Sequence, residues 1–373
     1  MKNKVCHITS VHKRYDGRIF KKQCMSLNNA GFEVVLIVND SLGDEIIEGI
    51  KILSTNYIPN NRLLRFIKSG PKLYEKAVEV DADIYHLHDP DLLLVGNKLK
   101  RLGKKVIFDS HEDYPSDIAD KEWIPYILRK FVSKIYALYE KYSIKNYDAI
   151  ISVSPQIIDR LRMINKNTYM ITNYPIMKDK ESINTLNIKK YNNDVCFAGA
   201  INKDWGHHIV MDAVSSIDSI KYIIAGPSDD RYLSKLKNKK SWNKVDYRGV
   251  VTSSEVQNIY NQSKMGIALH YSNSLAGKGT LGNTKLFEFM EAGLPVICSD
   301  YPLWDEIIKK HRCGISVNPR NENEVREAIK YIISNNNEAK LMGENGILAV
   351  QNEYNWGMQE RVLMKLYKDI SRA

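Results

Sequence analysis

The feature that most constrains the fold is a regular alternation of short apolar runs, rich in β-branched residues, with longer amphipathic segments. This alternation predicts a parallel sheet with helices on both faces, because strands buried on both sides are apolar throughout. In the N-terminal half, the predicted strands are Val5–Ile8, Val34–Val38, Ile52–Ser54, Ile84–His88, Val106–Ser110 and Ala149–Val153. The predicted helices between them include Phe20–Ala30, Leu63–Val80 and Leu92–Arg101.

The same alternation begins again in the C-terminal half, after the polar stretch Met177–Asn193. The strands predicted there are Asp194–Ala198, Lys221–Ala225, Lys244–Arg248, Met265–Leu269, Pro295–Ser299 and Gly314–Val317. A chain of 373 residues exceeds what one hydrophobic core usually serves. We therefore predict the α/β class, with doubly wound, Rossmann-like domains over 1–176 and 177–355. Such sheets bind ligands at the carboxyl ends of their strands, so we expect the two domains to face an interdomain cleft.

Composition narrows the class of protein further. The chain is 43% hydrophobic and 26% charged, which is typical of a globular protein. It contains no apolar stretch long enough for a membrane span, and its N-terminus does not resemble a signal peptide. The odd number of cysteines and the absence of a C-x-x-C pair predict buried free thiols in a reducing compartment. The cysteines are Cys6, Cys24, Cys196, Cys298 and Cys313. We therefore expect a cytoplasmic protein, with contact at the inner face of the cell membrane as a further option.

The net charge of +10 is more concentrated in the N-terminal half. Such an excess suits nucleic acid, an acidic substrate or an anionic membrane surface. The sequence has no zinc-finger spacing, no aromatic RNA-binding strand and no basic tail, so we do not expect nucleic acid as a partner.

The segment 122–141 bears on the membrane hypothesis, because it interleaves apolar and aromatic residues with Arg and Lys. One interpretation is an amphipathic helix that lies in a membrane interface. The other is an ordinary helix that covers the sheet and has a solvated basic edge. The sequence leaves both open.

The most informative segment for chemistry is 277–297, where a glycine-rich loop leads into an amphipathic run that ends at Gly293. Backbone N–H groups in such a loop can approach an anion closely, and the helix that follows favours phosphate. Glycine-rich loops also form plain turns. Glu288, about one turn into the predicted helix, could accept hydrogen bonds from both hydroxyls of a ribose, or it could simply face solvent.

Two D-x-D pairs, Asp81 with Asp83 and Asp89 with Asp91, flank a predicted strand of the first domain. In some enzymes such a pair holds a divalent cation on the diphosphate of a substrate. Here both pairs lie away from the glycine-rich loop, and D-x-D matches arise by chance in an acidic-residue-rich chain. We therefore predict no metal site.

The run 285–297 resembles the donor-site signature of glycosyltransferase family 4, whose members are retaining enzymes of the GT-B fold. Further segments resemble motifs of a bacterial polysaccharide-assembly branch of this family, in the same order along the chain. They are 12–22, 81–89, 106–113, 153–155, 173–175, 197–199, 224–227 and 247–250. The resemblance implies a GT-B fold in which the last helix, 356–373, crosses back to the N-terminal domain with Trp356 at the crossing.

The resemblance also implies a role for individual residues of the donor domain. Glu288 would bind the donor ribose, and Lys203 and Lys285 could supply positive charge to the diphosphate. The diphosphate would be cradled by a loop that includes Gly279, Thr280, Leu281 and Thr284. Gly249 and Val250 would lie beside the nucleobase.

In the first domain, the resemblance places His111 opposite the transferred sugar, where an imidazole could hydrogen-bond a hydroxyl or the developing anomeric centre. Glu112 and Asp16 complete the predicted catalytic group. Arg18 would pair with donor phosphate or, alternatively, with Asp16.

Three positions depart from the family pattern. Thr280 occupies the place of a glutamate that often contacts the donor sugar. Ala200 and Trp205 stand where the family commonly has basic residues of the diphosphate loop. These departures affect the expected contacts to the sugar and to the diphosphate.

The function implied is transfer of a hexose-type sugar from a nucleotide-diphosphate donor, with a UDP-sugar favoured, to a glycan or lipid-linked glycan acceptor. Configuration would be retained, no cofactor would be required, and the pathway would be cell-surface polysaccharide biosynthesis, such as capsule or O-antigen. One alternative is a nucleotide-sugar epimerase or hydrolase on the same fold. The other is a catalytically silent nucleotide-sugar-binding subunit.

Overall fold

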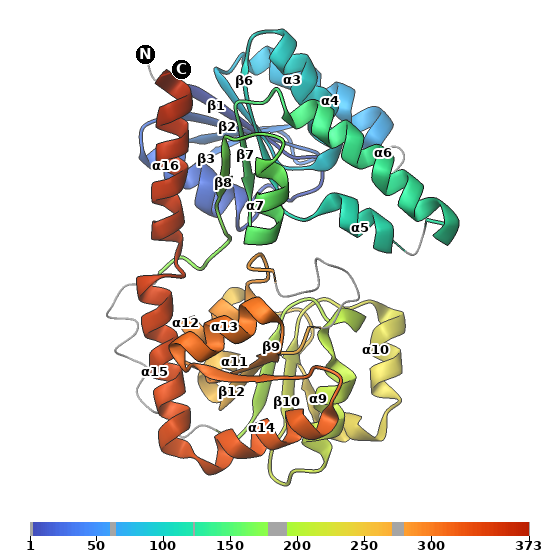
Figure 1. The fold of residues 1–373 in the computed structure, drawn as a ribbon, viewed down its shortest axis with the longest axis vertical. Coiled ribbons are helices and arrows are strands. Elements are labelled where there is room, and N and C mark those ends of the chain that lie inside the picture. Colours follow the sequence, from blue (N-terminus) through green and yellow to red (C-terminus); the bar gives the residue numbers. More distant parts are fainter. Residues whose placement is uncertain (1–2, 60–64, 122–123, 178–191, 271–279, 373) are drawn as a thin grey trace. The chain divides into compact units, whose positions relative to one another are not determined.

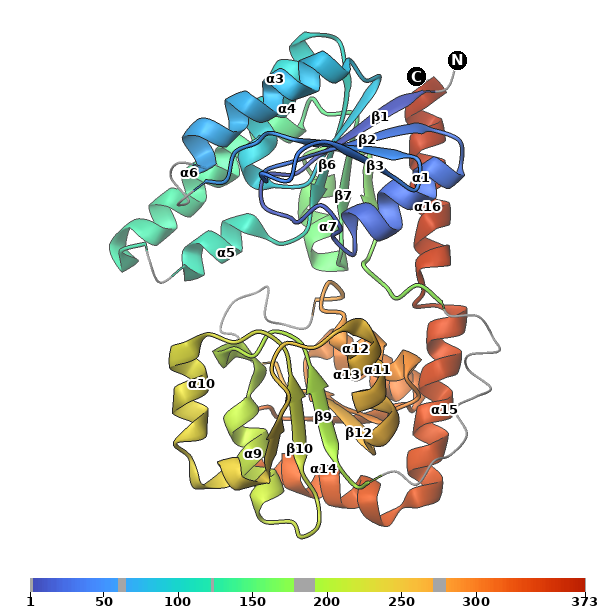
Figure 2. The same ribbon diagram turned by 180° about the vertical axis from the view of Figure 1, so that it is seen from behind.

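The structure is a computed structural model that describes residues 3–59, 65–121, 124–177, 192–270 and 280–372. The chain forms two compact units, each a largely parallel sheet covered by helices (Figures 1 and 2). Unit 1 comprises Met1–Asn173 and Trp356–Ala373, and unit 2 comprises Tyr174–Asn355. The predicted α/β class with two Rossmann-like sheets is therefore confirmed.

Unit 1 contains an eight-stranded sheet in the order β3-β4-β2-β1-β5-β6-β7-β8. Neighbouring strands pair in parallel, except that β3 and β4 are antiparallel. The strands are β1 (Lys4–Ile8), β2 (Glu33–Val38), β3 (Glu45–Ile47), β4 (Ile50–Ser54), β5 (Ile84–Leu87), β6 (Lys105–Ser110), β7 (Ala149–Ser152) and β8 (Thr168–Met170). The six predicted strands are present. β3 and β8, of three residues each, were not predicted from the sequence.

The helices of unit 1 lie on both faces of this sheet. They are α1 (Met25–Asn29), α3 (Gly70–Val80), α4 (Leu93–Arg101), α5 (Tyr114–Asp120), α6 (Tyr126–Ile144), α7 (Pro155–Arg162) and α16 (Trp356–Arg372). Short helical turns, Ile19–Cys24, Arg65–Ser69 and Pro90–Leu92, lead into α1, α3 and α4. The three predicted helices are confirmed within the described residues; the predicted start at Leu63 lies outside them.

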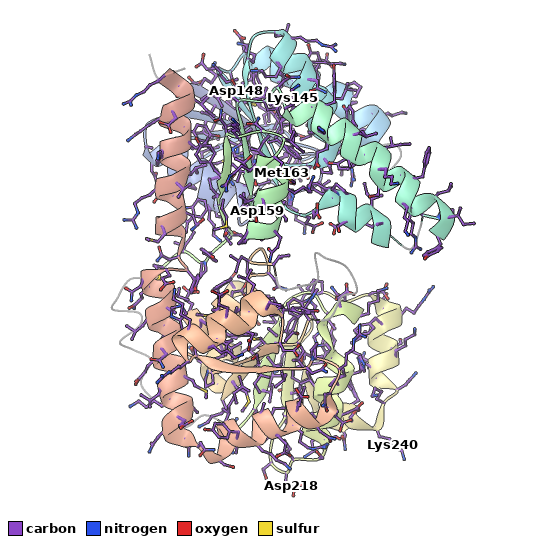
Figure 3. All side chains as sticks on the ribbon, in the orientation of Figure 1. Lys145, Asp148, Asp159, Met163, Asp218 and Lys240 are labelled. Carbon is purple, nitrogen blue, oxygen red and sulfur yellow. The ribbon has the colours of Figure 1, made fainter. Side chains whose placement is uncertain are left out.

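Two apolar clusters fill the space between this sheet and its helices (Figure 3). On one face, β-strand residues such as Leu87 pack against Leu73 of α3 and Leu99 of α4. On the other face, residues such as Leu36 pack against Leu27 of α1 and against α16. The sheet is therefore buried on both sides, which is why its strands read as continuous apolar runs.

The last helix, α16, belongs to unit 1, although the chain reaches it from unit 2. Trp356 donates its indole N–H to Ser26 Oγ at 2.9 Å, and Gln359 Oε1 accepts the backbone N–H of Thr172 at 2.9 Å. The predicted return of the C-terminal helix to the N-terminal domain, with Trp356 at the crossing, is confirmed.

Unit 2 contains a six-stranded parallel sheet in the order β11-β10-β9-β12-β13-β14. The strands are β9 (Val195–Ala198), β10 (Tyr222–Ala225), β11 (Val245–Tyr247), β12 (Met265–Ala268), β13 (Val296–Ser299) and β14 (Gly314–Val317). The helices are α9 (His207–Ser215), α10 (Asp230–Lys237), α11 (Ser253–Gln262), α12 (Lys285–Glu291), α13 (Pro302–His311), α14 (Glu322–Ser334) and α15 (Asn336–Asn352), with short helical turns at Lys203–Trp205 and Lys240–Lys244. All six strands predicted for this half are present.

The two units divide between Asn173 and Tyr174, slightly earlier than the predicted boundary at 176/177. Tyr174 belongs to unit 2 because its ring packs edge-on against Phe287, at 4.7 Å between centroids, and against Tyr354, at 5.4 Å. Residues 178–191 of the predicted linker lie outside the described part of the chain.

All five cysteines are buried free thiols, as predicted. Burial raises the pKa of each of them, so the thiols stay protonated near neutral pH. Within the described residues, no helix combines the length and the apolar character needed to cross a bilayer.

Gly226, directly after β10, permits a close approach of two backbone segments in unit 2. Its φ is +133°, and a Cβ placed on it would lie 1.9 Å from the carbonyl oxygen of Gly199. By contrast, a Cβ on Gly103 of unit 1, with φ of +76°, would meet no atom within 4 Å.

We predict that Gly226→Ala destabilises the protein by at least about 2 kcal/mol, because it adds a steric clash to backbone strain. Gly103→Ala, the matched control, adds strain alone and should cost about 1 kcal/mol. Urea unfolding followed by tryptophan fluorescence measures both. Equal shifts of the two unfolding midpoints would show that the close approach at Gly226 is not tight.

Candidate active site

Polar residues gather where the strands of unit 1 end. His12 follows β1, Asp89 follows β5, and His111 follows β6. Because β1, β5 and β6 are parallel neighbours, their carboxyl ends lie at the same edge of the sheet. This edge is where doubly wound sheets bind ligands.

Asp109, near the end of β6, is the centre of a buried polar network, and its side chain is fully buried. Arg18 binds it bidentately, with Nε to Oδ2 at 3.0 Å and one terminal nitrogen to Oδ1 at 2.8 Å. Gln23 Nε2 donates to Oδ2 at 2.8 Å. Burial alone would raise the pKa of Asp109, but the charge of Arg18 and the contacts of neighbouring histidines outweigh it, and the pKa lies well below its usual value. Asp109 is therefore a fixed negative charge beneath the edge.

Three fully buried histidines, His7 of β1 with His86 and His88 of β5 and its end, lie beside Asp109. His7 Nδ1 and His88 Nε2 share a hydrogen bond of 2.9 Å, and His86 Nδ1 meets the hydroxyl of Tyr367 on α16 at 2.8 Å. Burial lowers the pKa of all three, that of His88 to about 3, so they remain neutral.

These three rings are close enough to suggest metal ligands. However, the ring planes of His86 and His88 differ by only 19° and those of His7 and His88 by 14°, with centroids 4.5 Å and 5.2 Å apart. The lone pairs of an imidazole lie in its ring plane, so stacked rings do not point at one common atom. The rings are thus arranged as a stack, with one hydrogen bond between His7 and His88, rather than as a ligand set.

His111 lies above this network and is partly exposed. Its Nε2 is 3.4 Å from Asp109 Oδ2 and 3.4 Å from His88 Nδ1. Asp109 and His88 thus hold one nitrogen of the imidazole and orient the ring at the edge of the sheet. The structure brings His111 to the carboxyl edge, as expected for a group that faces a substrate.

His12 is a site residue to which the sequence analysis gave no role, although it begins the motif 12–22. Its ring lies 5.0 Å from that of His111, and it contacts Asp16 Oδ2 and Asp89 Oδ1, each at 3.5 Å. Burial would lower the pKa of His12, but Asp16 and Asp89 outweigh it and the pKa is raised. The raised pKa favours the positively charged form of His12, next to His111.

Asp16 contacts the predicted catalytic histidine only through His12. Its Oδ1 accepts the backbone N–H groups of Arg18 at 2.8 Å and Ile19 at 2.9 Å. Burial would raise the pKa of Asp16, but these bonds and His12 hold it below its usual value, so the carboxylate remains ionised. This carboxylate fixes the backbone at Arg18 and Ile19 and favours the protonated form of His12.

The guanidinium of Arg18 is buried against Asp109 and does not bind the carboxylate of Asp16. Of the two partners considered for Arg18, donor phosphate and Asp16, the pair with Asp16 is therefore wrong, and the phosphate contact stays a prediction. The reason is that Arg18 turns inward toward an uncompensated buried carboxylate, which is far costlier to leave unpaired than a half-exposed one.

Glu112 follows His111 and is exposed. It is close to Asp117 of α5, and burial together with a hydrogen bond to Glu112 raises the pKa of Asp117 to about 8. Glu112 and Asp117 thus form a pair of neighbouring carboxyl groups at this position.

The D-x-D aspartates bind protein groups. Asp89 Oδ2 accepts from Thr9 Oγ1 at 2.7 Å and from the N–H of Ser10 at 2.6 Å. Asp91 accepts from Ser10 Oγ and pairs with Arg65 at 3.1 Å. In the other pair, Asp83 accepts the N–H of Lys4 and Asp81 pairs with Lys104. These carboxylates organise loops of unit 1.

In unit 2, three glycines, Gly199, Gly226 and Gly249, follow β9, β10 and β11 at the carboxyl edge. The N–H of Gly226 donates to the carbonyl of Gly249 at 2.7 Å. Lys285 of α12 passes over this surface: a Cβ on Gly199 would lie 2.9 Å from Lys285 Cε. A side-chain-free edge with a cation above it can admit an anion close to the backbone.

Glu288 lies on α12 beside that cation and is half-buried. Its carboxylate accepts from Thr284 Oγ1 at 2.6 Å, from Tyr260 Oη at 3.1 Å and from Lys285 Nζ. Burial would raise the pKa of Glu288, but Lys285 and these hydrogen bonds lower it below its usual value. A carboxylate offers about four acceptor sites, so Glu288 retains capacity for a hydroxyl.

Tyr260, on α11, was not expected in the site, because a tyrosine in an amphipathic helix carries no distinguishing signal. The other predicted donor residues are placed as follows. Thr280 uses its carbonyl to accept from the indole of Trp304 at 3.3 Å, and Leu281 is buried in the core. Lys203 and Val250 are exposed, Val250 by 77%. Gly279 lies outside the described residues.

Trp205, one of the departures from the family pattern, packs its ring against Phe197, at 4.9 Å between centroids, and edge-on against His270, at 5.1 Å. Trp205 therefore forms an aromatic contact next to β9. At this position the loop has an apolar ring where the family commonly has a basic side chain.

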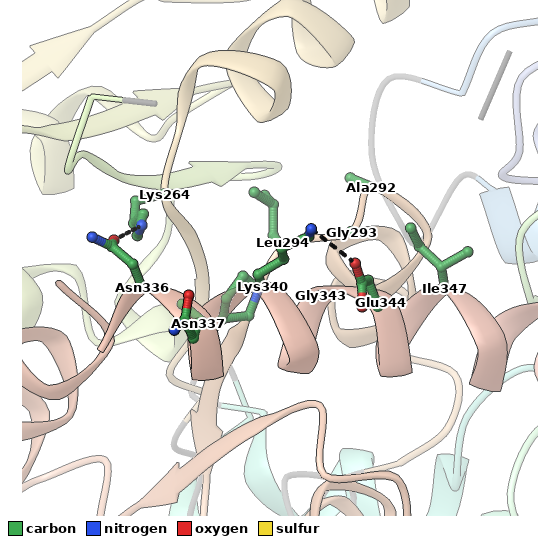
Figure 4. Close-up of a pocket in the computed structure, with 12 residues that line it drawn as sticks. Lys264, Ala292, Gly293, Leu294, Asn336, Asn337, Lys340, Gly343, Glu344 and Ile347 are labelled. Atoms are coloured by element: carbon green, nitrogen blue, oxygen red, sulfur yellow. Dashed lines mark hydrogen bonds and ion pairs between the residues drawn. The ribbon is translucent and has the colours of Figure 1, made fainter. Parts of the chain in front are cut away.

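A separate pocket in unit 2 lies between the loop before β13 and helix α15 (Figure 4). Lys264 donates to Asn336, and Lys340 faces Glu344 at 3.7 Å in this pocket. The loop residues that line it precede β13, so the pocket is at the amino edge of the sheet, opposite the edge that doubly wound sheets use for ligands. None of the predicted donor residues lines it.

Comparison with known proteins identifies the two halves separately. A model described as Glycosyltransferase Family 4 matches residues 18–172, and one described as Glycosyl transferases group 1 matches residues 178–348. Two proteins of Methanocaldococcus jannaschii, both described as uncharacterized glycosyltransferases, are 24% identical to the chain. The match to the first covers 48% of this chain and 46% of that protein, so the chain spans less than half of its length. The match to the second covers 73% of this chain and 79% of that protein.

Among solved structures, sucrose-phosphate synthase from Thermosynechococcus elongatus is similar, with a TM-score of 0.78, 19% identity and full coverage of both chains. Anabaena HepE, solved with UDP and glucose, is similar with a TM-score of 0.71 at 12% identity, over 98% of this chain and 100% of that one. At these identities the likeness shows the fold.

The two sheets, the returning C-terminal helix and these likenesses define a protein of the GT-B glycosyltransferase class. Within that class, the matches to both halves place the chain in glycosyltransferase family 4, as its motifs indicated.

Because His7, His86 and His88 are buried and neutral, we predict that the stability of the protein depends on pH. Their pKa values are lower in the folded protein than the unfolded value near 6.5, so the stabilisation is present above that pH and is lost as the pH falls below it. Each such histidine contributes up to about 1.4 kcal/mol per pH unit in that range. The depressed pKa of Asp109 adds a further loss below about pH 4.

We expect the free energy of unfolding, measured in urea, to fall steeply between pH 6.5 and pH 4.5, and His7→Phe to reduce that slope by about one proton's share. The slope of the unfolding free energy against pH reports the protons taken up on unfolding, whereas the altered packing of the variant changes the free energy at every pH. A wild-type stability that is constant over this range would contradict the neutral, buried histidine cluster.

Proposed function

We propose that the chain transfers a hexose-type sugar from a nucleotide-diphosphate donor, UDP-linked by preference, to a glycan or lipid-linked glycan acceptor. Unit 2 binds the donor and unit 1 supplies the groups that face the sugar. The observation that carries the proposal is the pairing of Glu288 with Lys285 beside the glycine edge of unit 2. It offers a carboxylate for ribose hydroxyls and a cation for phosphate a few ångströms apart.

The donor's diphosphate would take Lys285 from Glu288, because two phosphate groups carry more negative charge than one carboxylate. Glu288 would then exchange the ammonium for ribose hydroxyls while Thr284 and Tyr260 keep its orientation. Exposed Lys203, following β9, provides a second cation. UDP is favoured because HepE, similar in fold, was solved with UDP and glucose.

In the proposed reaction the anomeric C–O bond to the diphosphate breaks, and its electron pair stays on the phosphate oxygen. The acceptor oxygen bonds to the anomeric carbon from the same face, and its proton passes to the departing diphosphate. Lysines and loop amides stabilise the leaving charge. His111, held by Asp109, hydrogen-bonds the sugar, and protonated His12 adds positive charge beside it.

We propose that the reaction requires no metal ion or cofactor, since the D-x-D carboxylates are engaged by protein donors. Transfer that survives EDTA supports this, and transfer restored only by Mn²⁺ or Mg²⁺ contradicts it. The five free thiols support a reducing compartment such as the cytoplasm, and the family branch that the motifs resemble supports cell-surface polysaccharide synthesis.

We predict that Glu288→Gln weakens UDP binding about 10- to 100-fold, because hydrogen bonds to a charged group contribute about 1.5–3 kcal/mol. Titration calorimetry with UDP and with GDP measures this. Glu344→Gln, which changes an acid of the amino-edge pocket, is the matched control and should bind as wild type. Unchanged UDP affinity in Glu288→Gln would remove Glu288 from the donor site.

His111→Ala should lower the rate of sugar transfer by about 100-fold or more while leaving UDP affinity unchanged. His311→Ala, on α13 of unit 2, is the control.

Product analysis with donor alone tests the alternatives: rapid turnover without acceptor indicates a hydrolase or epimerase, and the absence of binding by any nucleotide diphosphate indicates that the donor assignment is wrong. Binding without turnover for any donor and acceptor tried indicates a silent subunit.

A further inference from the structure

Helix α6 buries only a small part of its surface. The buried side chains lie at its C-terminal end and are those of Glu140, Ser143 and Ile144. Glu140 forms an ion pair with Arg160, and Ser143 accepts from Asn97 at 2.9 Å. A helix that covers a sheet normally buries its apolar face. α6 buries Ile144 in the core of unit 1, as a covering helix does, but most of its large apolar side chains are exposed.

The apolar face of α6 is exposed instead. Side chains spaced by three or four residues form one stripe along the helix. The stripe consists of Ile127 (88% exposed), Phe131 (62%), Ile135 (50%), Leu138 (69%) and Tyr142 (61%). Single exposed apolar side chains are common on proteins, but a continuous stripe of five marks an interaction surface.

The fold of unit 1 explains why the stripe remains uncovered. The opposite side of α6 is packed by α5, with Ser133 Oγ donating to the carbonyl of Pro115 at 2.6 Å and Tyr136 stacked edge-on with Tyr114. The N-terminal half of α6 extends with α5 beyond the edge of the sheet (Figures 1 and 2). Side chains around this outer end project into open space (Figure 3).

A row of lysines runs beside the apolar stripe, again at helical spacing. Lys130, Lys134, Lys141 and Lys145 are all exposed, and within the described residues no ion pair involves any of them. The only acidic residue from 126 to 145 is Glu140, which is buried. The exposed surface of α6 is therefore apolar along one line and purely basic along the next.

We propose that α6 is a membrane-docking helix, whose apolar stripe inserts into the interface of an anionic phospholipid bilayer while its lysine row binds the headgroups. Charge decides the occupant. A second copy of the chain docked on this stripe would bring two lysine rows together, and like charges oppose such a contact. An anionic bilayer accepts the apolar stripe and the lysines at once. The inference goes beyond the transfer reaction and does not depend on it.

The test is flotation of the full chain with vesicles, in the absence of any donor. The vesicles are phosphatidylcholine alone, or phosphatidylcholine with 30% phosphatidylglycerol, a proportion of roughly the order that gives a physiological surface charge. We expect strong binding to the anionic vesicles that weakens as salt screens the lysines, and weak binding to the neutral ones.

Two variants with matched controls separate the two parts of the surface. Lys130→Gln/Lys134→Gln/Lys141→Gln should reduce binding on the order of 100-fold, since each lysine contributes about fivefold near an anionic surface. Its control changes exposed lysines of unit 2, in Lys235→Gln/Lys237→Gln/Lys240→Gln. Phe131→Ser/Leu138→Ser should abolish the binding that remains at high salt.

The control for the apolar pair is Leu341→Ser/Leu348→Ser on α15, whose side chains are 57% and 53% exposed. Since all these positions are exposed, the variants should unfold at the wild-type urea concentration. The proposal is overturned if wild type ignores anionic vesicles, if the α6 variants and the controls bind equally, or if sedimentation without lipid shows a dimer that Phe131→Ser/Leu138→Ser dissociates. UDP binding, measured separately, distinguishes failure here from failure of the proposed function.

Discussion

The candidate site of unit 1 depends on one buried charge, the carboxylate of Asp109. It lies at the end of a central strand with no access to water, where an unpaired carboxylate would be prohibitive. Arg18 and Gln23, on the helical turn after β1, and the histidines of β5 converge on it. The same charge orients His111 at the edge. Segments distant in the sequence are thus tied to one another through Asp109, and removal of one partner affects the others.

The candidate site of unit 2 contains few buried polar groups, in contrast to the site around Asp109 in unit 1. Glycines after β9 and β10 bring the backbone so close together that no side chain fits between them. The space left over this edge is occupied by the ammonium of Lys285, which Glu288 holds in place. In the donor complex that we propose, Lys285 moves to a phosphate and Glu288 keeps Thr284 and Tyr260 as hydrogen-bond partners. A carboxylate that must release a cation on binding benefits from such additional donors.

The segments that form the candidate sites could be predicted from the sequence, whereas the partners of individual side chains could not. The position of His111 at a strand end and of Glu288 one turn into a helix follow from periodicity and from family motifs. The partner of Arg18 did not follow, because Asp16 is two residues away in the chain whereas Asp109 is brought near only by the pairing of β1, β5 and β6. Likewise, nothing in the local sequence marks Tyr260 as a contact of Glu288.

The sequence by itself determined the α/β class, twelve of the strands, the free thiols and the family, because each rests on local periodicity or on motifs in a fixed order. The three-dimensional packing was needed to show which groups share the buried charge of Asp109, that His12 lies next to His111, and which face of α6 is covered. These depend on contacts between residues far apart in the chain. For α6 the periodicity indicated an amphipathic helix, but only its packing against α5 and, through Ile144, against the core of unit 1 showed that the apolar stripe is exposed.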